Sequence, residues 1–309
     1  MSETIRISVV ICTYNREKYI RKTLNSIAEQ SLSYDTFELV VVNNNSMDAT
    51  TSLVEAFIRD NPRMQILFCN EPNQGLSFAR NRGIAESQAD VITFLDDDAI
   101  APVDFLEKAL ELFYQTSDTL AIGGKIIPEF VDGKPNWYSS FFWGVTGQFD
   151  PGHTAGHILY WGKFPCGSNM TFHKKFFEKY GLFNTNLGRK GVVLIAGEEK
   201  ELFSRVKEHA DKRRVWYYPE LLVYHMVDNT KLNAAYIKKF SYGFALGEKL
   251  EVAQAPFFKK LTRYIEYTLK PIAAMGVAFF YLTTGRAANA GMRFRFAWWI
   301  VDGIWSRNK

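Results

Sequence analysis

Cysteine is scarce in this sequence, with three residues among 309, and no two of them stand in the C-x-x-C spacing of a zinc site or a redox pair. A disulfide framework therefore gets no support, and a reducing compartment is indicated. The segment "MSETIRISVV" at the start lacks the basic residues and the apolar stretch of a secretory signal. We expect a cytoplasmic location.

Glycine-rich nucleotide motifs are missing as well. The sequence contains neither G-x-G-x-x-G nor G-x-x-x-x-G-K-[ST], which argues against a dinucleotide-dependent dehydrogenase and against a P-loop NTPase. Long apolar runs are also lacking in the C-terminal part. The uncharged stretch Pro271–Thr284 falls short of the ~20 residues that a membrane-spanning helix needs.

Apolar runs with strand character recur through the first hundred residues, in a chain that is 47% hydrophobic. These runs are Ile5–Ile11, Phe37–Val42, Gln65–Cys69 and Val91–Leu95. Between them, apolar residues return at helical spacing, as in Ile20, Leu24 and Ile27, and Leu76–Ser87 is expected to be a third helix. Continuous apolar strands separated by helices predict an α/β fold, Rossmann-like, with a mostly parallel central sheet flanked by helices.

Polar residues follow each of these four strands, in the segments "CTYNR", "NNNSMD", "NEPNQG" and "DDD". Ligands of open parallel sheets bind outside the C-terminal ends of the strands. At an effective dielectric near 20, two carboxylates about 4 Å apart repel by roughly 4 kcal/mol, and a hard divalent cation removes that repulsion. The run Asp96–Asp98 therefore predicts a metal site. The alternative is that Asp98 caps the helix that begins in "AIAPVDFLEKAL".

Six segments, in their order and spacing, resemble the family 2 glycosyltransferases, which use the GT-A fold. They are "VVICTYNR", "VVVNNNSMDAT", "NQGLSFARNRGIAES", "ITFLDDDA", "PCGSNMTFHKKFFEKYGLFN" and "AGEEKELFSRV". The resemblance covers about residues 5–227. It implies an inverting enzyme that moves a sugar from a nucleotide-diphosphate sugar to an acceptor hydroxyl, assisted by Mn²⁺ or Mg²⁺ bound at a DXD motif.

The resemblance also implies which residues bind the donor. Thr13 and Tyr14 would lie against the nucleotide base, with Asn43 and Asn44 at its edge, and Arg80 would lie near the diphosphate. The family often has Asp where this chain has Asn43. An amide oxygen still accepts a hydrogen bond from uracil, but its NH₂ group adds donors that a carboxylate lacks. We expect a UDP-sugar.

Metal binding and catalysis fall, by the same resemblance, to residues of two other segments. Asp98 would bind the metal directly, with Asp96 and His225 as further ligands, while Asp96 and Asp97 would also reach the ribose or hold the loop. A lone His that follows a strand is more often structural, so His225 keeps that alternative.

Glu199 would be the general base that takes the acceptor's proton, with Glu198 in support. This pair stands where the family has Glu-Asp. An ordinary acidic helix start is the alternative for "GEEKELFSRV".

Two other functions remain open for this set of candidate site residues. One is a glycoside hydrolase that uses the same carboxylates, and the other is a nucleotide-sugar-binding protein without turnover.

The C-terminal tail carries the positive charge of the chain. Residues 256–309 hold nine Lys/Arg against Glu266 and Asp302, interleaved with Trp and Phe. Such segments lie in the headgroup region of membranes, so we expect peripheral attachment to the inner face of the cell membrane. A helical hairpin packed on the catalytic domain or on a second subunit is the alternative. No nucleic-acid partner is expected, and the oligomeric state is open.

We therefore expect a GT-A domain over residues 1–228, followed by a basic, aromatic-rich helical appendage over 229–309. The domain would divide into a nucleotide-binding half, 1–98, and an acceptor-binding half, 99–228. The acceptor would be a glycan or lipid-linked saccharide of polysaccharide biosynthesis. The aromatic segment Asn136–Gly144, with Tyr160 and Trp161, is expected to contribute to the acceptor pocket.

Overall fold

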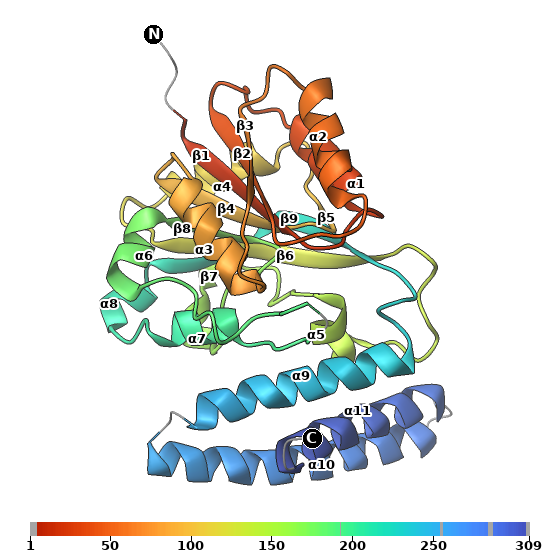
Figure 1. Cartoon of the computed structure of the whole chain (residues 1–309). Helices are drawn as coiled ribbons and strands as arrows, with labels where there is room; N and C mark the ends of the chain where they lie inside the picture. The colour runs from red at the N-terminus through yellow and green to blue at the C-terminus, as the bar shows by residue number, and fades with distance from the viewer. Residues whose placement is uncertain (1–4, 192, 254–255, 284–286, 307–309) are drawn as a thin grey trace. The chain divides into compact units, whose positions relative to one another are not determined.

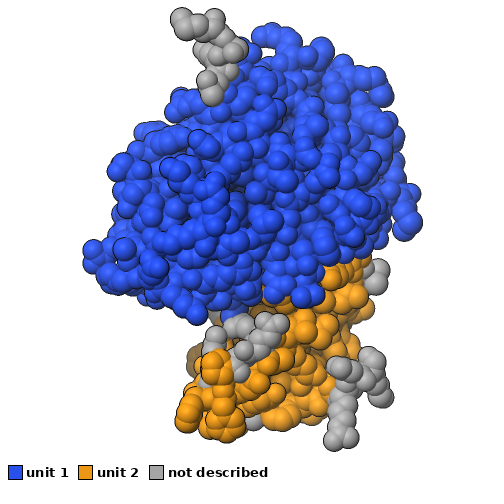
Figure 2. Space-filling view, turned by 60° about the vertical axis from the view of Figure 1, so that its left-hand side comes forward, with its two compact units in different colours: residues 1–129, 147–186, 198–226 blue, residues 130–146, 187–197, 227–309 orange. Residues whose placement is uncertain are grey.

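The computed structural model describes residues 5–191, 193–253, 256–283 and 287–306. These residues form two compact units, each discontinuous in sequence (Figure 2). The first, blue, comprises residues 1–129, 147–186 and 198–226. The second, orange, comprises residues 130–146, 187–197 and 227–309.

Four parallel strands form the first half of the sheet in unit 1 (Figure 1). They are β1 (Ile7–Thr13), β2 (Phe37–Asn43), β3 (Ile66–Asn70) and β4 (Val91–Asp96), in the spatial order β3-β2-β1-β4. Except on β3, their apolar side chains are almost entirely buried, as expected of strands covered on both faces. The predicted parallel sheet is confirmed, with strand bounds within two residues of those expected.

Helices cover both faces of these strands. They are α1 (Ile20–Ala28), α2 (Thr50–Asp60), α3 (Leu76–Glu86) and α4 (Phe105–Tyr114). Helices α1 and α2 contact each other, and α3 packs on β1 and β2 from the opposite face (Figure 1). A Cβ added at Gly83 would lie 2.3 Å from Val10 Cγ1, so a glycine is what lets α3 approach the sheet this closely.

The other strands extend the sheet mainly by antiparallel pairing, to nine strands among the described residues. They are β5 (Ala99–Ile100), β6 (Ala121–Phe130), β7 (Gly156–His157), β8 (Met170–His173) and β9 (Val215–Val227). Strand β8 pairs with β4 and with β6, while β5 and β7 both pair with β9. The sheet therefore continues past β4 into the region that follows the three Asp residues.

Asp98 does not cap the next helix. It is followed by the short strand β5, and α4 begins only at Phe105, with Asp104 at its N-cap position. The alternative reading of Asp98 as a helix cap is therefore excluded. Unit 1 also contains the short helices α6 (Lys174–Tyr180), α7 (Glu198–Ser204) and α8 (His209–Lys212).

Unit 2 is built on three long helices, α9 (Ala234–Ala253), α10 (Phe257–Thr283) and α11 (Ala287–Trp305). Helix α11 contacts both α9 and α10. The short turns η1 (Ser140–Phe142) and α5 (Trp143–Thr146) contribute Phe142 and Val145 to an apolar cluster with Ile237 of α9. Within the described ranges, none of the helices has both the length and the apolar character needed to cross a membrane.

Candidate active site

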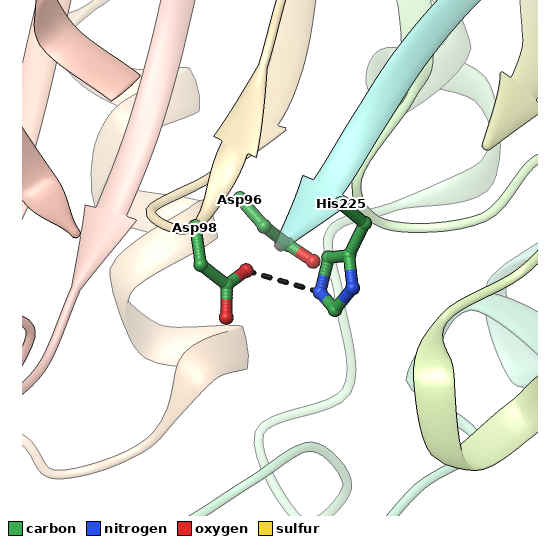
Figure 3. A group of neighbouring side chains, drawn as sticks. All are labelled: Asp96, Asp98 and His225. Atoms are coloured by element: carbon green, nitrogen blue, oxygen red, sulfur yellow. Dashed lines mark ion pairs between the residues drawn. The ribbon is translucent and has the colours of Figure 1, made fainter. Parts of the chain in front are cut away.

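The register of β5 on β9 brings Asp98 and His225 together. Ala99 pairs with His225, and the carbonyl of Asp98 accepts a hydrogen bond from the Met226 backbone N–H at 2.8 Å. As a result, His225 Nε2 lies 3.0 Å from Asp98 Oδ1 (Figure 3). Asp96, at the end of β4, points its carboxylate toward the same imidazole (Figure 3). Ligand atoms of these three residues all lie within 4.8 Å of one another.

Asp96 has two further protein partners beyond the metal candidates, one on a loop and one on helix α3. Its carboxylate accepts a short hydrogen bond from Ser168 Oγ, and its other oxygen lies 3.9 Å from Arg80 Nη2. The Asp96 side chain is about a third exposed, whereas Asp98 is buried. Asp96 is therefore the carboxylate of the cluster that a ligand can reach most easily.

Arg16 holds the other two carboxylates. Its Nε donates to Asp97 Oδ1 at 2.8 Å, and its Nη2 lies 3.4 Å from Asp98 Oδ2. The Tyr14 backbone N–H also donates to Asp97, at 3.3 Å. Burial raises the pKa of Asp97 and the Asp98 charge adds to the rise, while Arg16 opposes it, and the net shift is upward. Asp97 thus ties the β1 loop to the acidic turn.

The residues present suit a hard divalent cation. Two ligands at right angles on a cation with bonds of ~2.1 Å lie about 3 Å apart, which matches the separation of His225 Nε2 and Asp98 Oδ1, although a hydrogen bond has the same length. His225 Nδ1 is buried and has no hydrogen-bond partner within the described part of the chain. Two carboxylates with one imidazole form a donor set that suits a divalent cation.

Arg80 connects this cluster to the predicted catalytic pair. Its guanidinium Nη1 lies 3.1 Å from Glu198 Oε1 and 3.1 Å from Glu199 Oε1, and Phe183 packs its ring 5.3 Å from the guanidinium carbon. Burial lowers the pKa of Arg80 and the adjacent carboxylates raise it, with a net upward shift. Arg80 therefore stays charged between Asp96 on one side and the Glu pair on the other.

Glu198 and Glu199 lie in the first turn of α7, yet their environments differ. The Glu198 side chain is 6% exposed and that of Glu199 is 18% exposed. Burial and the neighbouring Glu199 charge raise the pKa of Glu198 to about 8, against the opposing influence of Arg80. At neutral pH Glu198 is therefore held mainly in its protonated form.

Gly167 provides the space in which Arg80 and Glu199 meet. A Cβ added at this position would fall 2.2 Å from Arg80 Nη2 and 2.6 Å from Glu199 Oε1. Both groups are fixed by their own ion pair, so neither can easily move aside. The segment "PCGSNM" thus supplies the open contact at Gly167 and the Asp96 partner at Ser168.

The residues predicted to hold the nucleotide base lie at the C-terminal ends of neighbouring strands. Thr13 ends β1 and Asn43 ends β2, directly opposite each other in the register. Asn43 donates to Asn70 Oδ1 at 3.0 Å and to Thr51 Oγ1 at 3.3 Å, and its Oδ1 accepts from the Ser46 N–H. Thr13 and Asn43 are both buried at this edge of the sheet.

Asn44 organises the loop after β3. Its Nδ2 donates to the carbonyls of Glu71 and Asn73 at 2.9 and 2.8 Å, and its Oδ1 accepts from the Gly75 N–H at 2.7 Å. Gly75 has φ +148°, a backbone conformation that favours glycine. Asn44 thus fixes the loop that leads into α3, the helix that carries Arg80.

The aromatic residues singled out in the sequence lie in separate places. Trp161 packs on Tyr217, whereas His225 stands eight residues later on β9, which corresponds to about 26 Å along a strand. Trp143 belongs to unit 2 and is half exposed. The expected role of these residues at the acceptor stays a prediction.

Three residues of the site were not identified from sequence. Arg16 and Ser168 lie inside motifs that were recognised, but their side chains act through contacts with Asp residues far along the chain. Gly167 acts through the absence of a side chain. The sequence offered a signal only for Arg16. It is a basic residue in the loop after β1, and the loop after β4 is acidic.

Comparison with known proteins agrees with the motifs. The family model described as Glycosyl transferase family 2 matches residues 8–181. A glucosyl-dolichyl phosphate glucuronosyltransferase of Haloferax volcanii is 30% identical over 69% of this chain, and the match covers 66% of that relative. The chain thus spans about two thirds of that relative's length. A putative glycosyltransferase, EpsH, of Bacillus subtilis is 27% identical over 86% of this chain and 72% of its own length.

Solved structures share the fold. The mannosyltransferase PcManGT of Pyrobaculum calidifontis, in complex with GDP-Man and Mn²⁺, aligns with a TM-score of 0.63 at 18% identity, over 98% of this chain and 88% of that one. TarS 1-349 of S. aureus, in complex with UDP-GlcNAc, aligns with a TM-score of 0.55 at 19% identity, over 82% and 68%. The predicted GT-A fold with a helical C-terminal region is confirmed. With the family match over more than half of the chain, the conclusion is that this protein belongs to glycosyl transferase family 2.

Proposed function

We propose that this protein is an inverting, metal-assisted glycosyltransferase that moves a sugar from a UDP-sugar to a hydroxyl group of a glycan or lipid-linked saccharide. One observation carries the proposal: Arg80 joins Asp96 of the acidic turn to the Glu198–Glu199 pair. Leaving group and attacking hydroxyl must both be served within one site, and the ion pairs of Arg80 with both sets of carboxylates support a shared site for the two tasks.

The leaving diphosphate would be received at the acidic turn. Asp98, Asp96 and His225 would hold Mn²⁺ or Mg²⁺, which when bound supplies Lewis-acid stabilisation of the charge that develops on the diphosphate. The three carboxylates of the acidic turn (Asp96, Asp97 and Asp98) face the two guanidinium groups of Arg16 and Arg80, and Arg80 is shared with the Glu pair. This excess of negative charge favours a cation there.

Glu199 would act as the general base. The acceptor oxygen forms a bond to C1 of the donor sugar as the bond from C1 to the diphosphate oxygen breaks, and Glu199 takes the hydroxyl proton. Attack on the face opposite the diphosphate inverts C1. Because Glu198 keeps its own proton up to a pKa of about 8, the role of base falls to Glu199, the more exposed of the two.

Arg80 would position these groups. Its side chain is 3% exposed and makes ion pairs on both sides, so it fixes the spacing between the acidic turn and the base. We also propose that Arg80 lies near the diphosphate, with Asp96 and the metal site between them.

The donor base is proposed to be uracil, bound over Thr13, Tyr14, Asn43 and Asn44. Support comes from their position at the C-terminal ends of β1 and β2 and from the TarS neighbour, whose structure contains UDP-GlcNAc. The PcManGT neighbour contains GDP-Man, so guanine is the competing base.

The acceptor is proposed to be presented at the cytoplasmic face of a membrane, with unit 2 attached peripherally. The relative from Haloferax volcanii is named for a dolichyl phosphate-linked substrate. Helix α10 exposes many large apolar side chains, among them Phe257, Phe258, Phe279 and Phe280. Lys260 and Arg263 lie on the same helix, and attraction to anionic lipid amounts to about 1 kcal/mol per basic residue near the surface.

The test is a screen of nucleotide sugars for release of UDP, GDP or dTDP in the presence of Mn²⁺ and of membrane-extracted lipid-linked saccharides. UDP release that depends on both Mn²⁺ and acceptor supports the proposal. Saturable UDP binding without release from any donor would indicate a binding protein. Cleavage of a glycan without nucleotide or metal would indicate a hydrolase.

A further inference from the structure

Arg293 of α11 is a buried arginine in unit 2. Its exposed fraction is 8%, and its guanidinium carbon lies 4.6 Å from the ring centre of Phe141 and 4.4 Å from that of Tyr281. Its Nη2 donates to Ser139 Oγ at 2.9 Å and to the Tyr281 hydroxyl at 3.3 Å. The side chain is thus clamped between two aromatic rings with two hydroxyl groups at one end.

This guanidinium differs from the other well-anchored ones in having no counter-ion. Arg16, Arg80, Arg205 and Arg214 each form an ion pair with an Asp or Glu. Across the described residues, no carboxylate pairs with Arg293, and its buried Nε has no hydrogen-bond partner. A buried charge normally requires pairing, and contacts with two ring faces offset only part of its desolvation.

The donors around Arg293 match the oxygens of a phosphate group. A guanidinium presents its N–H groups in a fork that fits phosphate, and two hydroxyl groups beside it can donate to the same anion. Ser139 and Tyr281 are both only partly buried, so the approach to Arg293 leads past their hydroxyl groups. One strong cation flanked by two neutral donors fits a single phosphate rather than an extended polyanion.

The surroundings indicate what carries that phosphate. Phe279, Phe280 and Leu282, the sequence neighbours of Tyr281 on α10, are more than half exposed, and the ring centre of Phe280 lies 6.1 Å from that of Tyr281. Exposed apolar side chains beside a phosphate-binding group suit an amphiphile, because the hydrocarbon chain can lie on them while the anion reaches the arginine.

We infer that Arg293, Ser139 and Tyr281 form a binding site for the phosphate group of a polyprenol-type lipid, the carrier of the acceptor saccharide. This inference rests on the proposed function in that it names the lipid that presents the acceptor. It assigns to unit 2 the recognition of the lipid phosphate, in addition to attachment to the surface.

The experiment measures binding of the full-length protein to vesicles by flotation. Neutral phosphatidylcholine vesicles carry either polyprenyl phosphate or phosphatidylglycerol at the same surface charge, and inorganic phosphate is the soluble competitor. The wild type should bind the polyprenyl phosphate vesicles about tenfold more tightly or better, since losing a buried charge partner has effects of at least that size. Free phosphate should compete weakly.

Two variants of α11 give a matched pair. Arg293→Met should abolish the preference for polyprenyl phosphate, whereas Arg295→Met, which removes an exposed charge two residues away, should weaken binding to both kinds of vesicle alike and leave the preference intact. Tyr281→Phe keeps the ring and loses the hydroxyl, so it should reduce the preference only partly.

Thermal melting separates this role from a structural one. Because Arg293 is a buried charge without a counter-ion, Arg293→Met should melt at the same temperature as the wild type or higher, and it should lose the stabilisation that polyprenyl phosphate gives the wild type. A preference retained in Arg293→Met, an absent preference in the wild type, or an equal loss in Arg295→Met would overturn the inference. Mn²⁺-dependent UDP binding, measured in the same proteins, reports on the proposed function separately.

Discussion

His225 Nε2 lies 3.0 Å from Asp98 Oδ1, although Asp98 lies in the turn before β5 and His225 lies on β9, far along the sequence. The contact follows from the pairing of β5 with β9, in which Ala99 stands opposite His225. If this pair holds the metal, Asp98→Asn and His225→Ala should each weaken Mn²⁺-dependent UDP binding by about tenfold or more, a loss typical even of groups that only support a metal ligand.

Isothermal titration of UDP, with Mn²⁺ and with EDTA, measures this effect. His153→Ala is the matched control, because that imidazole is exposed and belongs to the same unit. Equal enhancement of UDP binding by Mn²⁺ in the wild type and in both ligand variants would contradict the metal site.

The two Glu residues of α7 should differ when each is changed to Gln. Glu199→Gln should lower kcat by about 10²–10⁴ while UDP binding persists, because the variant cannot take the acceptor's proton. Glu198→Gln should keep most of its activity at pH 7, since an amide resembles the protonated carboxyl that a pKa of about 8 maintains there. Steady-state kinetics at pH 7 decides the matter, and a Glu198→Gln variant as inactive as Glu199→Gln would count against this division of roles.

The raised pKa of Glu198 also predicts how stability depends on pH. Its pKa lies near 8 in the folded protein and near 4.5 in the unfolded chain, so between these values the unfolded state binds fewer protons. The contribution of this group to the free energy of unfolding is therefore fully present below about pH 4.5 and is lost as pH rises toward 8, by an amount on the order of a few kcal/mol.

Thermal melting of the wild type and of Glu198→Gln across this range isolates the effect, because the amide does not titrate. The difference in melting temperature should shift in favour of Glu198→Gln as pH rises from 5 toward 8. A difference that stays constant across these pH values would show that Glu198 titrates normally.

Gly167→Ala should disturb the contact between Arg80 and Glu199. The added methyl group overlaps both side chains, at 2.2 and 2.6 Å, and small displacements of a catalytic group can lower rates by about 100-fold. We expect a fall in kcat with UDP affinity largely retained. Gly291→Ala in α11 is the control, since a Cβ there meets nothing within 4 Å. Comparable kcat values for Gly167→Ala and Gly291→Ala would show that Gly167 does not help to position Arg80 and Glu199.

Substitution of exposed aromatic residues on α10 tests membrane attachment in the full-length protein. Phe258→Ser and Phe280→Ser together should reduce flotation with anionic vesicles by about tenfold or more, because each side chain loses roughly 1.5–3 kcal/mol of apolar burial. Met47→Ser, in unit 1, removes an apolar side chain that is 84% exposed and should have no such effect. Undiminished flotation of the double variant would leave the packing of α10 on another subunit as the better explanation.

The first four strands and their order of appearance could be predicted because each is a continuous apolar run between helical periods, as Val91–Asp96 illustrates. Strand β5 could not be predicted, because a strand of two residues has no measurable period and exists only through its pairing with β9. From sequence, Asp98 was a plausible cap for the helix that follows, because β5 could not be foreseen. The N-cap position is instead held by Asp104, another Asp a few residues later.

The site was predictable as far as its motifs reach. The cluster of Asp96, Asp98 and His225 was expected from resemblance and is brought together in the structure. The bridge that Arg80 makes to Glu198 could not be foreseen, because no local pattern connects α3 with the start of α7. Nor could the sequence show that residues 130–146 pack with the helices of unit 2. They do so through contacts such as Phe142 with Phe296.

The register of β5 on β9 has a consequence for the length of the chain between them. Successive side chains of a strand point to opposite faces, so inserting or deleting a single residue between Asp98 and Ile100 would present Tyr224 or Met226, in place of His225, to the acidic turn. Neither replacement is a metal ligand of comparable strength. Homologues that vary in this turn should therefore do so by even numbers of residues, or carry a compensating bulge in β9.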